Sequence, residues 1–286
     1  MVSKIILLFL TNILIMVQSD SINQEVDGDL KYDIKTLISE KDWSTLFPVQ
    51  GIRGCHGAEL LSHKNFVAAV EEVWAKGSKF LRSKNMQQNR VELAAFLAQT
   101  SHETTGGYDG AKPPRYFWGY CFPTEISHAN KYCSEASAAT CKANHYDCKC
   151  VPGKAYYGRG PIMLSWNYNY GKFSQSYFKD NRLMANPDLL EKKGDIAFIA
   201  AIWFWSTPDY SKPSCHDVIL GITKPSDVRG RDVGFGLLTD IINGGLECGH
   251  GNDKRENDRI GFYNHYLKYF GVSDNRQKSC AHIRPF

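Results

Sequence analysis

AAFLAQTSHETTGG at residues 94–107 and WGYCFPTE at residues 118–125 are the segments from which the fold and the chemistry of this chain are predicted. The first is an apolar helical pattern that reaches Glu103 and is stopped by two glycines. Glu125 closes the second segment, which is aromatic and holds a cysteine. Hydrolysis of a glycosidic bond needs two carboxyl groups in unlike surroundings, because one must carry a proton and the other must be ionised. The stretch therefore predicts a glycoside hydrolase.

The two glutamates are expected to have different roles. Glu103 ends an apolar helix, where partial removal from water favours the protonated carboxyl group, so it is the candidate general acid. Glu125 lies in a polar loop beside Thr124 and Ser127 and is the candidate general base. Ser165 is the candidate for orienting the attacking water. A single glutamate is most often a solvated surface group or a partner in an ion pair at a helix end, but the surrounding glycines and aromatic residues favour the catalytic interpretation.

Other motifs in the sequence fail on their spacing. His102-Glu103 begins like a zinc protease motif, but glycine stands where the second histidine would be, at position 106. The glycine-rich stretch 157–161 is not followed by the Gly-Lys-Ser/Thr of a phosphate loop. His250, between two glycines, fits a structural turn better than a catalytic base. A zinc site could be drawn from Cys141, His145, Cys148 and Cys150, but the spacing lacks paired CxxC motifs. No metal or other cofactor is expected.

The first residues indicate export. Residues 1–19 have the pattern of a secretory signal peptide, with Lys4 before an apolar run at 5–17 that is short for a membrane span. The alternative is a buried N-terminal helix. We expect a secreted, extracellular protein that does not contact a membrane after the signal is cleaved. The nine cysteines fit an oxidising compartment, and their odd number leaves at least one outside an internal pair.

Composition and charge bound the remaining possibilities. The chain has 286 residues, of which 43% are hydrophobic and 22% charged, so it can bury a sizeable core. Its net charge of +4 comes without a block of lysines or arginines, which argues against a nucleic acid partner. We expect a monomer with three parts: the signal peptide, an N-terminal extension or linker at 20–48 that ends in a docking helix or turn, and one catalytic domain at 49–286.

Helical periodicity dominates the catalytic domain. Apolar stripes predict helices at 64–75, 90–101, 195–205, 233–242 and 258–270. The helix at 195–205 is apolar almost all round, as a central buried helix would be. Residues 104–165 are rich in Gly, Pro, Tyr and Cys and predict long loops with a small hairpin. The expected fold class is mostly α, formally α+β, with a cleft built from loops.

Taken together, eight ordered segments closely resemble the family 19 glycoside hydrolases, the chitinases best known from plants. The segments are 94–107 (AAFLAQTSHETTGG), 118–122 (WGYCF), 156–165, 167–171 (NYNYG), 186–189, 201–205 (AIWFW), 241–251 (IINGGLECGHG) and 258–263 (DRIGFY). They run from about Cys55 to Cys280 in the order of the family.

The resemblance implies a fold, a reaction and a set of site residues. The fold would be lysozyme-like and bilobal, with a deep cleft between the lobes. The reaction would be endo-hydrolysis of β-1,4-linked N-acetylglucosamine polymers with inversion, so chitin or chitooligosaccharide is the expected partner. Glu103 falls on the family's general acid, Glu125 on its general base and Ser165 on the residue that holds the water. Positions that line the cleft or tune the acid are His102, Thr105, Tyr168, Asn169, Lys212, Asn243, Glu247 and Arg259.

The family pattern also implies how the cysteines pair. It implies the bridges Cys55–Cys121, Cys133–Cys150 and Cys248–Cys280, with Cys141–Cys148 as an added bridge in an elongated loop. Cys215 takes a position where the family usually has serine and is expected to be a free thiol.

Four departures from the family concern substrate binding. Met163 replaces a glutamine, Trp166 a histidine and Tyr108 a tryptophan, and residues 134–149 lack the tryptophan common in plant enzymes. Two alternatives therefore stay open beside an active chitinase. One is a catalytically silent chitin-binding protein, and the other is an enzyme acting on peptidoglycan.

Overall fold

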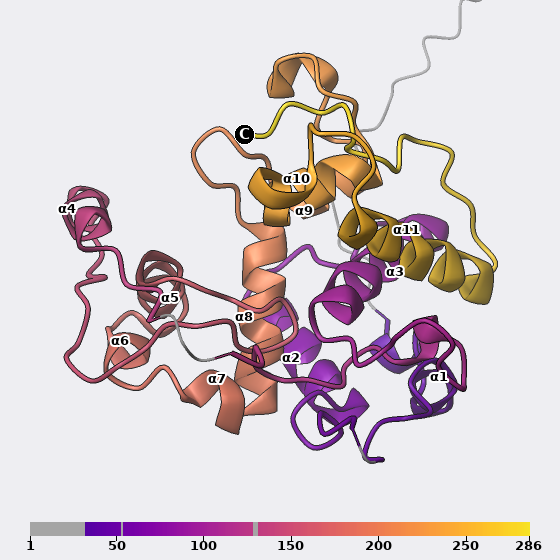
Figure 1. The fold of residues 1–286 in the computed structure, drawn as a ribbon, viewed down its shortest axis with the longest axis horizontal. Helices are drawn as coiled ribbons and strands as arrows, with labels where there is room; N and C mark the ends of the chain where they lie inside the picture. Colours follow the sequence, from indigo (N-terminus) through magenta and orange to yellow (C-terminus); the bar gives the residue numbers. More distant parts are fainter. Residues whose placement is uncertain (1–31, 53, 128–130) are drawn as a thin grey trace, which may run out of the picture.

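The computed structural model describes residues 32–52, 54–127 and 131–286. The predicted signal peptide and residues 20–31 of the predicted extension lie outside this part of the chain. The described residues form a mostly helical molecule (Figure 1). Its α-helices are α1 Glu40–Leu46, α2 His63–Ala75, α3 Met86–Glu103, α4 Glu135–Ala143, α5 Asn167–Phe173, α6 Arg182–Ala185, α7 Leu189–Lys192, α8 Gly194–Ser206, α9 Cys215–Ile219, α10 Phe235–Glu247 and α11 Lys254–Phe270. Short helical turns are η1 Ile34–Thr36, η2 Arg115–Phe117, η3 Ser174–Phe178 and η4 Pro225–Val228.

Helix α8 divides the molecule into two sides. Figure 1 shows α4, α5, α6 and α7 on one side of it and α3, α9, α10 and α11 on the other. Helix α8 packs along α2, and α3 packs along α11. Trp205 of α8 is fully buried against Phe96 of α3, with ring centroids 5.5 Å apart. The helix predicted at 195–205 is apolar on almost all sides because it is buried at the centre of the molecule, and this prediction is confirmed.

The five helices predicted from periodicity are confirmed as α2, α3, α8, α10 and α11. Two of them, α3 and α11, begin four residues earlier than predicted, because polar caps precede the apolar stripe. Asn85 accepts the Gln87 amide at the start of α3, and Asp253 accepts the Arg255 amide at the start of α11. Helix α10 runs past the predicted end to Glu247 across a kink at Asn243.

A buried polar network ties α3 to α8 and α9. Glu92 is fully buried, and one of its oxygens accepts the Trp205 indole N–H at 3.0 Å and pairs with His216 Nδ1 at 2.6 Å. The other oxygen accepts the amide of Leu81 at 3.0 Å. Burial alone would lower the pKa of His216, but the hydrogen bond and charge of Glu92 raise it above its ordinary value. The network fixes three helices in one relative position.

The described end of the predicted extension is part of the core. Ser39 and Asp42 form a capping box that starts α1. Trp43 is buried and stacks on the rings of Phe66 and Tyr120, with centroids 5.6 and 5.1 Å away. The segment therefore docks on the domain through an aromatic cluster.

The loop region at 104–165 differs from the prediction in two ways. Within the described residues its β structure is limited to the single bridges Thr124–Arg159 and Arg159–Leu164, so the expected hairpin is minimal. Two prolines next to these bridges, Pro123 and Pro161, lack the N–H that would extend the ladder. Helix α4 was missed because it is mostly exposed and has no apolar stripe to reveal it.

Four disulfides hold the loops and the end of the chain. They join Cys55 to Cys121, Cys133 to Cys150, Cys141 to Cys148 and Cys248 to Cys280, the pairs that the family pattern implies. Cys215 is free and buried, and burial raises the pKa of its thiol far above the ordinary value. None of the described helices has the length and apolar character needed to cross a membrane.

Candidate active site

A cleft of about 780 Å³ opens between the two sides of the molecule. Its walls come from the end of α3, the loops around 122–126 and 162–169, the end of α8 and the kinked half of α10. Eight residues predicted from the sequence line it: Glu103, Thr105, Glu125, Ser165, Tyr168, Asn169, Lys212 and Asn243. The other three, His102, Glu247 and Arg259, do not line it, but Arg259 contacts Glu103 and Glu247 contacts Asn243.

The two glutamates share the cleft because the chain turns back along the end of α3. The Thr104 carbonyl, just past Glu103, accepts the amides of Cys121 and Phe122 at 3.0 and 2.9 Å. Gly119 is needed in this return, since a Cβ atom there would lie 2.4 Å from Ser101 Oγ. The bridge Cys55–Cys121 anchors the same segment. Glu125 therefore follows a segment that is fixed to the end of the Glu103 helix.

Glu125 is held by backbone and by a tyrosine. Its amide donates to the Gly158 carbonyl at 3.0 Å, and the Gly158 amide donates to Glu125 Oε2 at 3.3 Å. Burial raises the pKa of the Tyr132 hydroxyl, and its hydrogen bond to the Glu125 carboxylate raises it further. Ser165 Oγ donates to the Met163 carbonyl at 2.8 Å. A Cβ atom on Gly158 would lie 3.4 Å from Glu125 Oε2 and 3.3 Å from Ser165 Oγ, so both oxygens border the same space.

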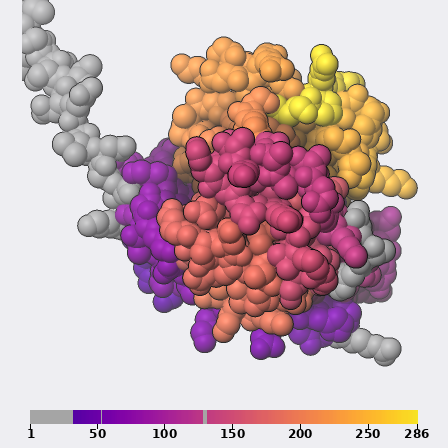
Figure 2. Space-filling view, turned by 90° about the vertical axis from the view of Figure 1, so that its left-hand side faces the viewer, coloured from indigo at the N-terminus to yellow at the C-terminus, as the bar shows by residue number. Residues whose placement is uncertain are grey.

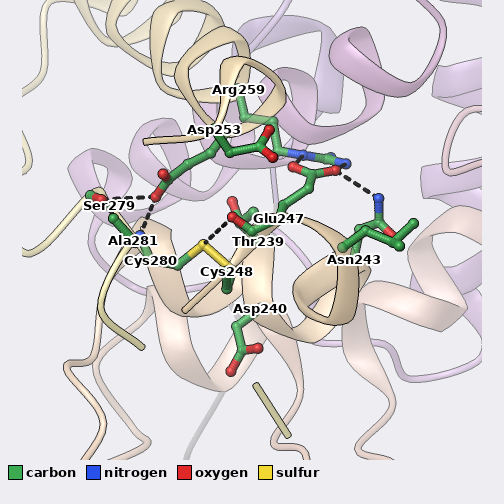
Figure 3. Close-up of a disulfide and its surroundings, with 12 residues drawn as sticks. Thr239, Asp240, Asn243, Glu247, Cys248, Asp253, Arg259, Ser279, Cys280 and Ala281 are labelled. Carbon is green, nitrogen blue, oxygen red and sulfur yellow. Dashed lines mark hydrogen bonds and ion pairs between the residues drawn. A yellow bond between two sulfur atoms is a disulfide. The ribbon is translucent and has the colours of Figure 1, made fainter. Parts of the chain in front are cut away.

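Glu103 belongs to a buried cluster centred on Arg259 of α11. The Arg259 guanidinium donates to Glu103 Oε1 at 2.5 Å and to Gln99 Oε1 at 2.7 Å. It also grips both oxygens of Glu247 at 2.7 and 2.8 Å, a bidentate contact that fixes its plane. The Asn243 amide donates at 2.7 Å to Glu247 Oε1, the oxygen that also accepts from Arg259 Nη2 (Figure 3). The cluster thus joins α3, α10 and α11 directly behind the cleft.

The charges of this cluster are strongly coupled. Arg259 and Glu247 are each 1% exposed, whereas the Glu103 side chain is 17% exposed and reaches the cleft. Burial would raise the pKa of Glu247, but the hydrogen bonds and charge of Arg259 lower it below the ordinary value. Burial likewise opposes the charge of Arg259, yet its two carboxyl partners raise the Arg259 pKa. The Arg259–Glu247 pair is therefore a stable ion pair.

His102 is oriented by a second pair of charges. Its Nδ1 pairs with Asp258 Oδ2 at 2.6 Å, and the other oxygen of Asp258 accepts from Arg115 Nε. Burial would raise the pKa of Asp258, but these two partners hold it below its usual value. These contacts fix the orientation of the His102 imidazole. His102 precedes Glu103 in the sequence but does not line the cleft.

Lys212 braces the kink in α10. Asn243 has φ −144° and ψ 29°, which interrupts the helix. Lys212 Nζ donates to the Ile241 carbonyl at 3.0 Å, within the interrupted turn. The lysine lines the cleft and also stabilises the part of α10 that carries Asn243.

Sequence comparisons match this chain to a family. The family model described as class I chitinase matches residues 37–280, which is most of the chain. The chain belongs to glycoside hydrolase family 19. Inactive chitinase-like protein 1 of Hevea brasiliensis is 42% identical over 263 residues, covering 91% of this chain and 78% of that protein. An endochitinase of Pisum sativum is 42% identical over 257 residues, covering 89% of this chain and 75% of that protein.

Solved structures of family 19 proteins agree with the fold. The class IV chitinase of Zea mays has a TM-score of 0.64 and 26% identity, over 87% of this chain and all of that one. Chitinase C of Streptomyces griseus has a TM-score of 0.63 and 27% identity, over 85% of this chain and 97% of that one. The mostly helical, lysozyme-like fold expected from the resemblance is confirmed. As a family 19 member, the protein is a glycoside hydrolase of the chitinase type.

Two residues that contact the site in this structure went unnoticed in the sequence. Gln99 is fully buried one turn before Glu103 and accepts a hydrogen bond from Arg259. A polar residue on an otherwise apolar helical stripe is a signal that could have revealed it. Tyr132, which contacts Glu125, lies in a loop with no periodicity and carried no such signal.

Two of the three residues expected to depart from the family have unusual backbone conformations. Met163 and Trp166 line the cleft with φ values of 48° and 76°, in the left-handed region that non-glycine residues rarely adopt. Trp166 stacks on Tyr168, with ring centroids 6.1 Å apart. Tyr108 is 60% exposed, packs near Trp118 and does not line the cleft. Two of the three residues therefore line the cleft.

The cysteines considered for zinc are bonded to other cysteines. Cys141 pairs with Cys148, and Cys150 pairs with Cys133. Glu135 lies close to the second pair, but sulfurs joined in a disulfide are not thiolate ligands.

Proposed function

We propose that this protein is a secreted endochitinase that hydrolyses β-1,4 bonds between N-acetylglucosamine units with inversion. Glu103 would be the general acid and Glu125 the general base. The observation that carries the proposal is that both carboxyl groups line one cleft and have unlike partners, a buried ion pair for Glu103 and backbone with a tyrosine for Glu125. Membership of a chitinase family supports the substrate.

Glu103 lies between the cleft and the buried charges behind it. Arg259 contacts Glu103 at 2.5 Å and Glu247 at 2.7 Å. The carboxyl group reaches the cleft and can deliver its proton to the glycosidic oxygen as the bond to the anomeric carbon breaks.

Glu125 is suited to activate water. A water in the space beside Gly158 could contact both Glu125 Oε2 and Ser165 Oγ, which border that space. Glu125 would take one proton from this water while the water oxygen attacks the anomeric carbon on the face opposite the leaving group. The Ser165 hydroxyl donates to the Met163 carbonyl, so its oxygen would accept a hydrogen bond from the second O–H of the water, which stays on the anomeric carbon of the product. An inverting site needs its carboxyl groups roughly 6.5–9.5 Å apart, which leaves room for this water.

Export from the cell is part of the proposal. Four disulfides in one domain are typical of proteins that fold in an oxidising compartment. The predicted signal peptide at 1–19 agrees with such a route.

A catalytically silent chitin-binding protein is the second candidate. It is favoured by the relative named as inactive and by the two departures that face the cleft, Met163 and Trp166. The presence of Glu103 and Glu125 in the cleft favours turnover. Action on peptidoglycan is the third candidate, and clearing of bacterial cell walls compared with sugar release from chitin separates it from the first.

The test compares the parent protein with Glu103→Gln and Glu125→Gln on chitin hexasaccharide. We expect each variant to lose more than about 10²-fold in kcat, because each loses one proton-transfer group, and to bind the oligosaccharide almost as well as the parent. Glu71→Gln, an exposed glutamate of α2, is the matched control and should keep full activity. A parent that binds the sugar without cleaving it would instead establish the silent protein.

A further inference from the structure

Arg159 is a second buried arginine, and it has no role in the chemistry proposed above. Its side chain is 2% exposed. Nη2 donates to Asp188 Oδ1 at 2.7 Å and Nε donates to Glu191 Oε2 at 3.1 Å, so two carboxylates at α7 anchor the guanidinium. Nη1 donates to the hydroxyl of Tyr170 in α5 at 3.0 Å. Figure 2 faces the side of the molecule on which α5 and α7 lie.

The peptide group between Tyr157 and Gly158 connects this arginine with the proposed base. Its carbonyl accepts the Tyr170 hydroxyl at 2.7 Å and lies 3.5 Å from Arg159 Nη1. Its N–H belongs to Gly158 and donates to Glu125 Oε2 at 3.3 Å. A trans peptide group is planar, with its C=O and N–H pointing in opposite directions. Holding the carbonyl oxygen therefore also sets the direction of the N–H.

Arg159 also makes this N–H a stronger donor. A positive charge and a hydroxyl group at the carbonyl oxygen polarise the peptide group, and hydrogen bonds in a chain strengthen one another where water is excluded. The guanidinium lies 3.6 Å from the centroid of the Tyr157 ring, and Nη1 also donates to the Ala155 carbonyl at 2.9 Å. The chain before Gly158 is thus held against the guanidinium at several points.

The backbone of Arg159 reaches the segment that carries Ser165. Its amide donates to the Leu164 carbonyl at 3.3 Å, and its carbonyl accepts the Leu164 amide at 3.0 Å. Leu164 directly precedes Ser165, the candidate for holding the water. One buried residue is therefore adjacent in the chain or in a backbone pair to both groups that border the space for the water.

We propose that Arg159 is a positioning residue for catalysis: together with Tyr170 it sets the direction of the Gly158 N–H, and through it the orientation of the Glu125 carboxylate. This inference rests on the proposed function of Glu125 as the base. Arg159 does not line the cleft, so it acts through the peptide group and not on the substrate. A carboxylate held by a fixed donor keeps the orientation needed for attack by water, and small displacements of a reacting group lower the rate strongly.

Tyr170→Phe tests this connection without removing the buried charge. The change deletes only the hydroxyl between Arg159 and the Tyr157 carbonyl. We expect kcat on chitin hexasaccharide to fall by about three- to thirtyfold, because the Gly158 N–H loses its fixed direction. Affinity for the oligosaccharide, measured by calorimetry, should stay within about twofold of the parent, since no binding contact is removed.

Tyr156→Phe is the matched control. It removes a buried hydroxyl from the ring next to Tyr170, with centroids 5.5 Å apart. That hydroxyl accepts the Val151 amide and donates to the Met184 carbonyl, both at 3.0 Å, and it does not contact the Tyr157 carbonyl. The control should lose stability to urea as Tyr170→Phe does, but keep the kcat of the parent.

The pH profile of kcat/KM separates positioning from a loss of folded enzyme. Its acid limb reports the ionisation of the base in the free enzyme. A carboxylate whose hydrogen-bond donor is weakened takes up a proton at higher pH, so the limb of Tyr170→Phe should move to higher pH by about half a unit or more. Unfolded protein lowers the curve without moving it. Tyr132, the titratable side chain that contacts Glu125, is present in every variant.

Arg159→Lys is the second variant. It keeps the positive charge but loses the forked contacts of the guanidinium, so we expect the acid limb to move in the same direction and kcat to fall. An acid limb that stays in place in both variants would show that Arg159 and Tyr170 only stabilise the fold. A loss of kcat in Tyr156→Phe as large as in Tyr170→Phe would also overturn the inference.

The same experiment distinguishes this inference from the proposed function. If the parent is active, Glu125→Gln is inactive and both variants behave as the parent, the positioning role alone fails. If the parent cleaves no oligosaccharide, the proposed function fails and the inference fails with it.

Discussion

Arg259 is the residue on which the surroundings of the proposed acid depend most. Arg259→Ala would leave Glu247 buried without its charged partner, which typically costs about 3–5 kcal/mol of unfolding free energy. Arg259→Lys keeps the charge but loses the bidentate contact, so we expect a smaller loss of stability and a fall in kcat of about tenfold or more. Urea unfolding and hydrolysis of chitin hexasaccharide measure the two effects.

Arg255 supplies the matched control for that experiment. It lies four residues earlier on α11, is exposed, and pairs at 2.7 Å with the partly buried Asp253. Arg255→Ala should change stability by less than about 1 kcal/mol. Equal effects of the alanine substitutions at 255 and 259 would contradict the role assigned to the buried cluster.

The raised pKa of Asp240 predicts how the free energy of unfolding changes with pH. Burial raises its pKa from 3.8 to about 6, although Arg231, Lys212 and a backbone hydrogen bond at Phe286 pull it down. Between these two pH values the folded protein keeps a proton that the unfolded chain loses, so the unfolding free energy from this group falls as pH rises from about 4 to 6. Asp240→Asn cannot ionise and should be more stable than the parent at pH 7, by about 1–3 kcal/mol, with little difference at pH 4. Parallel curves of unfolding free energy against pH for the two proteins would refute this assignment.

At the scale of elements, the return of the chain along α3 sets the position of Glu125. Gly119→Ala would place a Cβ atom 2.4 Å from Ser101 Oγ. We expect a loss of about 1–3 kcal/mol in stability and a clear loss of activity, because the segment leading to Glu125 is pushed away from α3. Ser101→Gly in the same protein removes the clashing atoms and should restore part of the activity. Additive losses in the double variant would show that the close approach is not the cause.

Sequence periodicity predicted the helices that bury an apolar stripe, such as α2, α8 and α11. It missed α4, whose residues face water, and the kink at Asn243, which depends on Lys212 reaching across from another segment. These features arise from tertiary contacts that no local pattern records.

The same division applies to the site. The two glutamates were found from their local context, one at a helix end and one after an aromatic segment. Arg259 lies 156 residues from Glu103, so its place beside the acid could be inferred only from the family resemblance. Tyr132 lies in an irregular loop and was not found at all.

For the whole molecule, the disulfides should contribute according to the loops they close. Cys55–Cys121 closes 66 residues and Cys141–Cys148 only 7. The loop-entropy model predicts that replacing both cysteines by serine costs about 4 kcal/mol for the first pair and about 2 kcal/mol for the second. Urea unfolding of the two double variants compares them. The first should also lose activity, since its bridge anchors the segment before Glu125, and a larger stability loss for the shorter loop would contradict the model.

The most direct test of the proposed mechanism is the anomeric form of the first products released from chitin hexasaccharide, followed by NMR. Inversion at a β-linked sugar predicts that the new reducing ends appear first as α-anomers, with no such release by Glu103→Gln. Initial β-anomers would contradict the assignment of Glu125 as a base that activates water.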